Sequence, residues 1–236
     1  MEILGRLIPI AILLMLPMPA LRGQPSARPS GHWEGTIQVP EHELPVIVDL
    51  ATDARGGWIG SLTIPTSSSV DVPLSTIGVE GTSVKFTVNL PEKTSFEGTL
   101  SNDGDRLSGT VGNLDGTVPF QLVRRGDANV KRPPPSSALT KAFEGTWEGT
   151  IESQGKVKRV GLKLWAAADG TAMGSLIAIE QGKEIPLTTV SVKGAQLDLE
   201  ARSISGTYHG TLGANGDIAG EWIERTIHVP LTWHRK

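Results

Sequence analysis

The chain carries the same sequence pattern twice, and this internal repeat limits its possible folds more than any other feature. Gly-His-Trp-Glu-Gly-Thr at 31–36 returns as Gly-Thr-Trp-Glu-Gly-Thr at 145–150. Further matches follow in the same order, with Pro-Leu at 73–74 and 186–187, and Gly-Thr-Leu at 98–100 and 210–212. Self-similarity at a nearly constant spacing indicates one structural unit built twice. We therefore expect two tandem domains of one fold.

The limits of the repeat set the domain boundaries. We expect repeat 1 at residues 31–125 and repeat 2 at residues 142–236. Between them, residues 126–141 contain three consecutive prolines among polar residues, which is typical of a semi-rigid linker. Residues 24–30 are expected to be a short disordered lead.

The N-terminus is expected to be a signal peptide, residues 1–23. Arg6 precedes an apolar run at 7–16, which is too short to cross a bilayer, so no stable membrane span is expected. Cleavage is expected after Ala20 or Gly23. The chain has no cysteine, so an exported protein of this kind must gain its stability from packing rather than from disulfides. We expect a secreted or periplasmic protein of a bacterial envelope.

Hydrophobic residues alternate with period two in both repeats, which is typical of half-buried strands. Trp33, Gly35 and Ile37 share one face of the first segment, and Glu34 and Thr36 share the other. About eight such segments separated by turn residues occur in each repeat, and none after the signal reads as an amphipathic helix. The sequence predicts an all-β protein of two tandem antiparallel, meander-type β-barrels with about eight strands each.

The Gly-x-Trp motif at 31–33 and 145–147, which opens each meander, resembles the first strand of lipocalin-like barrels. The longer pattern, with Pro-Leu, Gly-Thr-Leu and a late Val-Pro, is similar to the β-rich domain that precedes α/β-hydrolase or peptidase domains in secreted bacterial proteins. That resemblance implies an accessory role, with an envelope protein such as a hydrolase as partner. No hydrolase domain follows in this sequence, so we expect the module to act alone, in duplicate.

The sequence offers no familiar set of catalytic or metal-binding residues. Thiol catalysis is impossible without cysteine, Gly-x-Ser-x-Gly is absent, and the five histidines lack metal-ligand spacing. The net charge of −3, without aromatic residues among the basic ones, argues against nucleic acid as a partner. We expect no enzyme activity, no metal and no cofactor. The alternatives are a stand-alone hydrolase with a site on Glu34, Glu148 or His209, and a purely structural envelope protein.

The expected function is that of an exported, non-catalytic binding or accessory module for a small apolar ligand or a partner protein. About eight strands enclose enough space either for packed side chains or for one small ligand, so the inward aromatic residues fit a dry core and a pocket alike. Both interpretations stay open at this point.

The two repeats differ in where their large side chains fall. Trp58 in the first corresponds to Ala172 in the second, whereas Val111 in the first corresponds to Trp222 in the second. If both interiors were only packed cores, such exchanges would roughly conserve volume. We therefore expect that any ligand cavity lies in the second repeat, near Ala172. Its expected ligand-binding residues are Trp147, Ala172, Tyr208 and Trp222.

Overall fold

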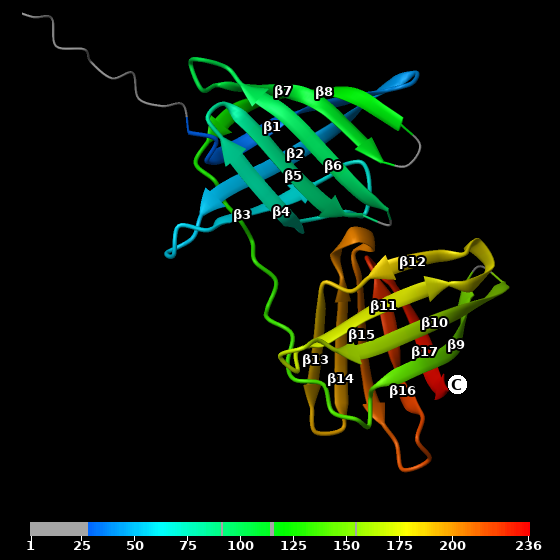
Figure 1. The fold of residues 1–236 in the computed structure, drawn as a ribbon. Coiled ribbons are helices and arrows are strands. Elements are labelled where there is room, and N and C mark those ends of the chain that lie inside the picture. The colour runs from blue at the N-terminus through cyan, green and yellow to red at the C-terminus, as the bar shows by residue number, and fades with distance from the viewer. Residues whose placement is uncertain (1–27, 91, 114–115, 154) are drawn as a thin grey trace, which may run out of the picture.

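The computed structural model describes residues 28–90, 92–113, 116–153 and 155–236. The expected signal peptide and the first four residues of the expected lead lie outside these ranges. Within them the chain forms two tandem β-barrels, joined by a linker that leaves β8 and runs to the second barrel (Figure 1). The predicted fold class is confirmed. No helix among the described residues is long and apolar enough to span a bilayer.

The first barrel is closed and antiparallel throughout, because each strand pairs with the next and β8 pairs with β1. Trp33 and Ile37 point inward and are buried, whereas Glu34 between them is exposed, as the period-two pattern predicts. The strands are β1 (Gly31–Val39), β2 (His42–Thr52), β3 (Trp58–Thr63), β4 (Val72–Glu80), β5 (Ser83–Asn89), β6 (Lys93–Leu100), β7 (Arg106–Asn113) and β8 (Gly116–Gly126).

The second barrel has nine strands, because the counterpart of β4 is interrupted. Its first half pairs with β11 and its second half with β14, with a break at Leu187 and Thr188. Two short 3-10 turns, η1 (Ile179–Gln181) and η2 (Arg202–Ile204), connect strands at one end. The strands are β9 (Gly145–Ser153), β10 (Lys156–Ala166), β11 (Ala172–Ala178), β12 (Lys183–Pro186), β13 (Thr189–Lys193), β14 (Gln196–Ala201), β15 (Gly206–Leu212), β16 (Ile218–Glu224) and β17 (Ile227–Arg235).

Glycines allow the strands of each barrel to approach closely. A Cβ atom added to Gly109 would lie 1.9 Å from the carbonyl oxygen of Glu97, and one added to Gly220 in the second barrel would lie 2.1 Å from that of His209. Such distances are far below van der Waals contact, so these positions exclude any side chain. The glycines on the inward face therefore set the tight coiling of both sheets.

The repeated Trp-Glu-Gly-Thr phrase builds the same closed end in both barrels. The Arg124 guanidinium lies 4.4 Å from the Trp33 ring centroid, and Arg235 lies 4.2 Å from Trp147. Each indole N–H donates to a carbonyl four residues upstream, of Pro29 at 2.9 Å and of Phe143 at 3.0 Å. The two arginines also donate to the backbone just before the first strands, at residues 28 and 30 and at residues 142 and 144. Residues 28–30, at the end of the expected lead, are thus bound to the barrel.

The linker is bound to both barrels. Near the first, the Asn129 N–H donates to the Asp49 carboxylate at 2.7 Å, and Arg132 pairs with Asp53 at 3.5 Å. Near the second, the Ser137 N–H donates to the Val190 carbonyl at 3.0 Å, and the Ser137 carbonyl accepts from Ala172 at 2.8 Å. The linker therefore bridges β13 and β11, and its second half forms part of the wall of the second barrel.

Candidate functional site: two unequal cavities

Three of the four residues expected to bind a ligand lie in the packed core of the second barrel. Trp147 is fully buried at the closed end, beneath Arg235. The Tyr208 hydroxyl donates to the carbonyls of Ile218 at 3.0 Å and Leu231 at 3.2 Å. Burial raises the pKa of the Tyr208 phenol well above its ordinary value, so this side chain stays neutral. Trp147, Ala172 and Tyr208 are not among the residues that line the cavity of this barrel.

The region around Ala172 is occupied rather than empty. The comparison of the two repeats predicted less side-chain volume here than in the first repeat, because Ala172 replaces Trp58. In the structure the linker runs along β11 here. Leu139 of the linker and Phe143, which lies just after the linker, pack into the core of the second barrel. Ala172 is fully buried in this core and does not line the cavity, so the expectation of a cavity bounded by Ala172 is corrected.

Trp58 itself does not lie in the core of the first barrel, although the alternation placed it inward. It is partly exposed and borders a hollow of about 240 Å³ between β3, β4 and the linker. The reason is that β3 and β4 are paired over a short length, at Ser61 with Pro73 and at Leu62 with Val72. Trp58 lies beyond the paired part, where the strands diverge and the linker passes.

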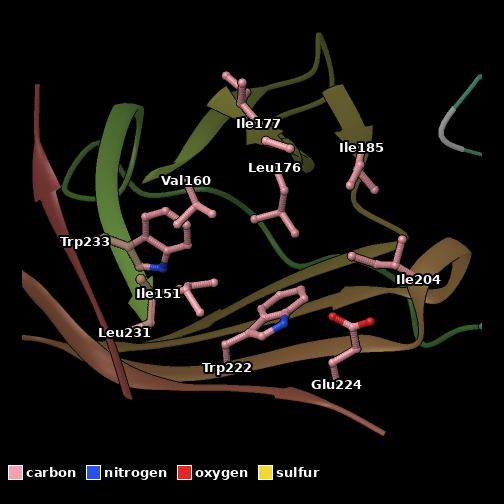
Figure 2. A pocket seen from close by; sticks show the side chains of 11 residues that line it. Ile151, Val160, Leu176, Ile177, Ile185, Ile204, Trp222, Glu224, Leu231 and Trp233 are labelled. Atoms are coloured by element: carbon pink, nitrogen blue, oxygen red, sulfur yellow. The ribbon is translucent and has the colours of Figure 1, made fainter. Parts of the chain in front are cut away.

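The second barrel does contain a cavity, which Trp147 does not line, but it is small, about 140 Å³. Figure 2 shows the side chains around it. Trp222 and Trp233 take up much of this part of the barrel, and the Trp233 indole N–H, although buried, has no hydrogen-bond partner among the described residues. Of the four expected residues, Trp222 alone reaches this cavity. Its lining residues are Ile151, Val160, Leu176, Ile177, Ala178, Ile185, Ile204, Trp222, Glu224, Leu231 and Trp233.

The first barrel has a larger cavity, about 490 Å³, at the equivalent end. Its deep part lies against Phe96, Val111 and Leu62, and its outer part against the hairpins around Pro40 and Leu90. Among the described residues that line it, none is charged, and the only side-chain polar groups are the hydroxyls of two threonines. The lining residues are Ile37, Val39, Pro40, Leu44, Leu62, Ile64, Leu90, Thr94, Phe96, Val111, Gly112, Gly116, Thr117 and Val118.

One pair of positions explains the difference in volume. In the second barrel the Trp222 ring lies over Gly206, where an added Cβ would be 2.2 Å from the indole. The corresponding residues of the first barrel are Val111 and Thr94, and both line the larger cavity. The signal was present in the sequence, because the gain of a tryptophan coincides with the loss of a side chain on the neighbouring strand. Sequence reasoning noted the tryptophan but not the glycine.

The titratable side chains lie mostly on the outer faces, where they pair across strands. Four histidines each contact a carboxylate: His32 with Asp49 at 3.0 Å, His209 with Asp198 at 2.8 Å, His228 with Glu221 at 3.2 Å and His234 with Asp217 at 2.9 Å. The hydrogen bond to Asp49 raises the pKa of His32, against the opposing effect of partial burial. Within the described ranges, no three histidine or acidic side chains gather as metal ligands.

The residues of the hydrolase alternative do not share a site. Glu34 lies on β1 of the first barrel, 3.6 Å from Arg125. Glu148 and His209 lie in the second barrel, on β9 and β15, which are separated by two strands in the sheet. Glu148 pairs with Lys236 and His209 with Asp198. The three side chains therefore make separate contacts on the surface of this structure.

No protein-family model matches this chain, and no curated protein matches it. One similar solved structure is a protein of unknown function of the DUF3598 family from Nostoc punctiforme, with 14% identity and a TM-score of 0.29. The aligned region covers 88% of this chain and 96% of the Nostoc chain. Another similar structure, provisionally described as an outer membrane protein of Bacteroides fragilis, has 11% identity and a TM-score of 0.29. The aligned region covers 88% of this chain and 97% of the Bacteroides chain. Likenesses this weak carry no argument about function.

Proposed function

We propose that this chain is an exported, non-catalytic binding module that holds a small, uncharged apolar molecule in its first barrel. The observation that supports it most is the cavity of about 490 Å³ at one end of a closed barrel, lined by apolar side chains. Ligand sites are typically concave, mostly apolar and equipped with a few polar groups. The export part of the proposal depends on the apolar N-terminal run, which lies outside the described residues.

The lining chemistry favours a neutral ligand. Burial of an ionised group without a partner is strongly unfavourable, and no charged side chain of the described ranges lines this cavity. The hydroxyls of Thr94 and Thr117 are the polar side chains available to an alcohol or carbonyl group of the ligand. A molecule with one polar end and an otherwise apolar body fits this distribution.

The same lining supports a non-catalytic role. General acid–base chemistry needs a titratable group within hydrogen-bond reach of the substrate. Of the residues that the structure describes, no histidine, carboxylate, lysine or tyrosine lines the cavity of the first barrel. An accessory role, in which the module delivers or retains a molecule for an envelope partner such as a hydrolase, is part of this proposal.

The proposal can be tested with N-phenyl-1-naphthylamine, a neutral apolar dye whose fluorescence rises on leaving water. The full chain is titrated beside a variant that copies the second barrel, Val111→Trp with Thr94→Gly. We expect the wild type to bind the dye and the double variant to bind it at least about tenfold more weakly, because the indole fills the cavity. Thr110→Trp, on the exposed face of the same strand, is the matched control and should bind as the wild type does. Absence of dye binding by the wild type, or equal binding by the double variant, would contradict the proposal.

A further inference from the structure

The two barrels are joined directly by a set of hydrogen bonds that we call the clasp, formed by residues 68–71 of the β3–β4 loop and residues 202–205 of η2 and its end. The Ser69 hydroxyl donates to the Ser203 carbonyl at 2.8 Å, and the Val70 N–H donates to the Arg202 carbonyl at 3.4 Å. The Ser205 hydroxyl donates to the Ser68 carbonyl. Ser69 and Ser203 are each only 5% exposed, so the contact excludes water.

Arg202 adds a charged member to the clasp. Its Nη1 donates to the carbonyls of Asp71 at 3.1 Å and of Lys131 in the linker at 2.8 Å. Its Nε donates to the Glu200 carboxylate at 2.9 Å, which fixes the guanidinium within the second barrel. One side chain therefore connects β14, the linker and the β3–β4 loop. Hydrogen bonds from a charged donor are stronger than neutral ones, especially where water is excluded.

The clasp is directly connected to one lining residue of each cavity. On the first barrel, the Ile64 N–H donates to the Ser69 carbonyl at 2.9 Å, and Ile64 lines the large cavity. On the second barrel, Ser203 is followed by Ile204, which lines the small cavity (Figure 2). A short path of direct bonds thus runs from Ile64 through Ser69 and Ser203 to Ile204.

The backbone at both sides of the clasp is held in an unfavourable conformation. Asp71 and Ser205 each have a φ of 49°, in the left-handed region that residues with a Cβ atom rarely adopt. Such residues persist where the surrounding contacts hold them, and they are common in elements that switch. Loss of the clasp would let both segments relax, and the loop that positions Ile64 would lose its fixed conformation.

We propose that the clasp couples the two barrels, so that the second barrel sets the affinity of the first for its apolar ligand. This proposal rests on the proposed function of the large cavity. With the clasp formed, Ile64 is fixed as one wall of a preorganised pocket; with the clasp broken, binding must also order the loop, and affinity falls. Coupling between sites is reciprocal, so a bound ligand stabilises the clasp in turn.

Two serines of the clasp provide a matched pair of variants. Ser69→Ala removes the hydroxyl that donates to the second barrel. Ser203→Ala removes a hydroxyl that is equally buried but has no hydrogen-bond partner among the described residues, and it leaves the Ser203 carbonyl in place. The full chain and both variants are titrated with N-phenyl-1-naphthylamine, and amide hydrogen exchange of residues 64–70 is measured with and without the dye. Circular dichroism confirms that each variant is folded.

We expect Ser69→Ala to weaken dye binding about fivefold or more and to accelerate exchange of the Ile64 and Val70 amides. Ser203→Ala should bind within about twofold of the wild type, and the dye should slow exchange across residues 64–70 in the wild type. A folded Ser69→Ala variant with wild-type affinity overturns the coupling while leaving the binding function intact. A wild type that does not bind the dye overturns the proposed function, and the regulation of that site with it.

Discussion

The two barrels share a closed end and differ at the open one. At the closed end, arginine, tryptophan and an upstream carbonyl make the same contacts in both, with ring distances of 4.4 and 4.2 Å. At the open end, Val111 and Thr94 leave about 490 Å³ in the first barrel, whereas Trp222 and Gly206 leave about 140 Å³ in the second. Duplication thus preserved the residues that form the fold and allowed those at the open end to diverge. The first barrel keeps the larger space at its open end, and the open end of the second barrel is largely filled.

The shared framework predicts the largest effect on stability. Gly109→Ala places a Cβ atom 1.9 Å from the Glu97 carbonyl oxygen, so two strands must separate. We expect a loss of about 3 kcal/mol in unfolding free energy, measured by urea denaturation. Gly78→Ala is the matched control, because Gly78 has open space around its Cβ position, and it should change stability by less than about 0.5 kcal/mol. Equal stabilities of the two variants would refute the close-approach explanation.

Emptying the second barrel tests the difference between the open ends. Trp222→Val removes most of a buried side chain and should lower the free energy of unfolding by about 2–3 kcal/mol. The same change should create a second apolar cavity, so that the full chain binds two molecules of N-phenyl-1-naphthylamine instead of one. Fluorescence titration at stoichiometric protein concentration gives the number of sites. If the number stays at one in a folded variant, the tryptophan is not what distinguishes the two open ends.

The linker contact predicts an effect confined to the second barrel. Ser137→Pro removes the N–H that donates to Val190 and the hydroxyl that accepts from Val192 at 2.8 Å. We expect the second barrel to lose about 2 kcal/mol of stability. Amide exchange should become faster in β13 and β14 but not in β1 to β8. Ser137→Ala keeps the backbone donor and should show about half of that loss. Equal acceleration in both barrels would mean that the linker does not belong to the second barrel.

The smallest expected effect concerns pH and the first barrel alone. Hydrogen bonding to Asp49 raises the pKa of His32 above its ordinary value of 6.5, so the charged imidazole stabilises the folded state. This stabilisation is fully present below pH 6.5 and is lost as the pH rises through the raised pKa. The facing charged groups are Asp49 and Glu34, with Arg125 beside Glu34.

We expect the effect of His32 to be below about 1 kcal/mol, because the side chain is partly exposed. Urea denaturation across pH 5.5 to 8.5 would show it as a decline in the stability of the first barrel. His32→Thr, which copies Thr146 of the second barrel, should remove the decline. A decline of the same size in the variant would assign it to another group.

The strand pattern was predictable from sequence because burial on one face imposes a strict period of two. Trp33 and Ile37 show it, and the internal repeat gave a second, independent copy of the same pattern. The interruption of the β4 counterpart at Leu187 was not predictable, because it depends on which neighbouring strand each half reaches. The expected barrel of about eight strands therefore has nine in the second repeat.

The candidate cavity was harder to predict, because volume depends on contributions from outside the repeat. Ala172 indicated an empty region because the comparison of the repeats did not include Leu139 of the linker or Phe143, which follows it. Backbone hydrogen bonds of Ser137 hold the linker beside β11 and β13, and such bonds have no sequence signature. Trp222 did indicate a difference between the open ends, but its effect on volume required knowing that it lies over Gly206.

The closed ends also define how the chain could be cut without loss of either barrel. Arg124 holds the carbonyls of residues 28 and 30, so a proteolytic maturation that stops before residue 28 keeps the first cap, and cleavage after Ala20 or Gly23 meets this condition. A separately expressed second half faces a stricter limit. If it begins at residue 142, it retains the carbonyls bound by Arg235 but lacks Ser137, which bridges β11 and β13. A fragment that starts at Pro134 keeps the carbonyls bound by Arg235 and also keeps Ser137. The second structural unit therefore extends well into the proline-rich segment.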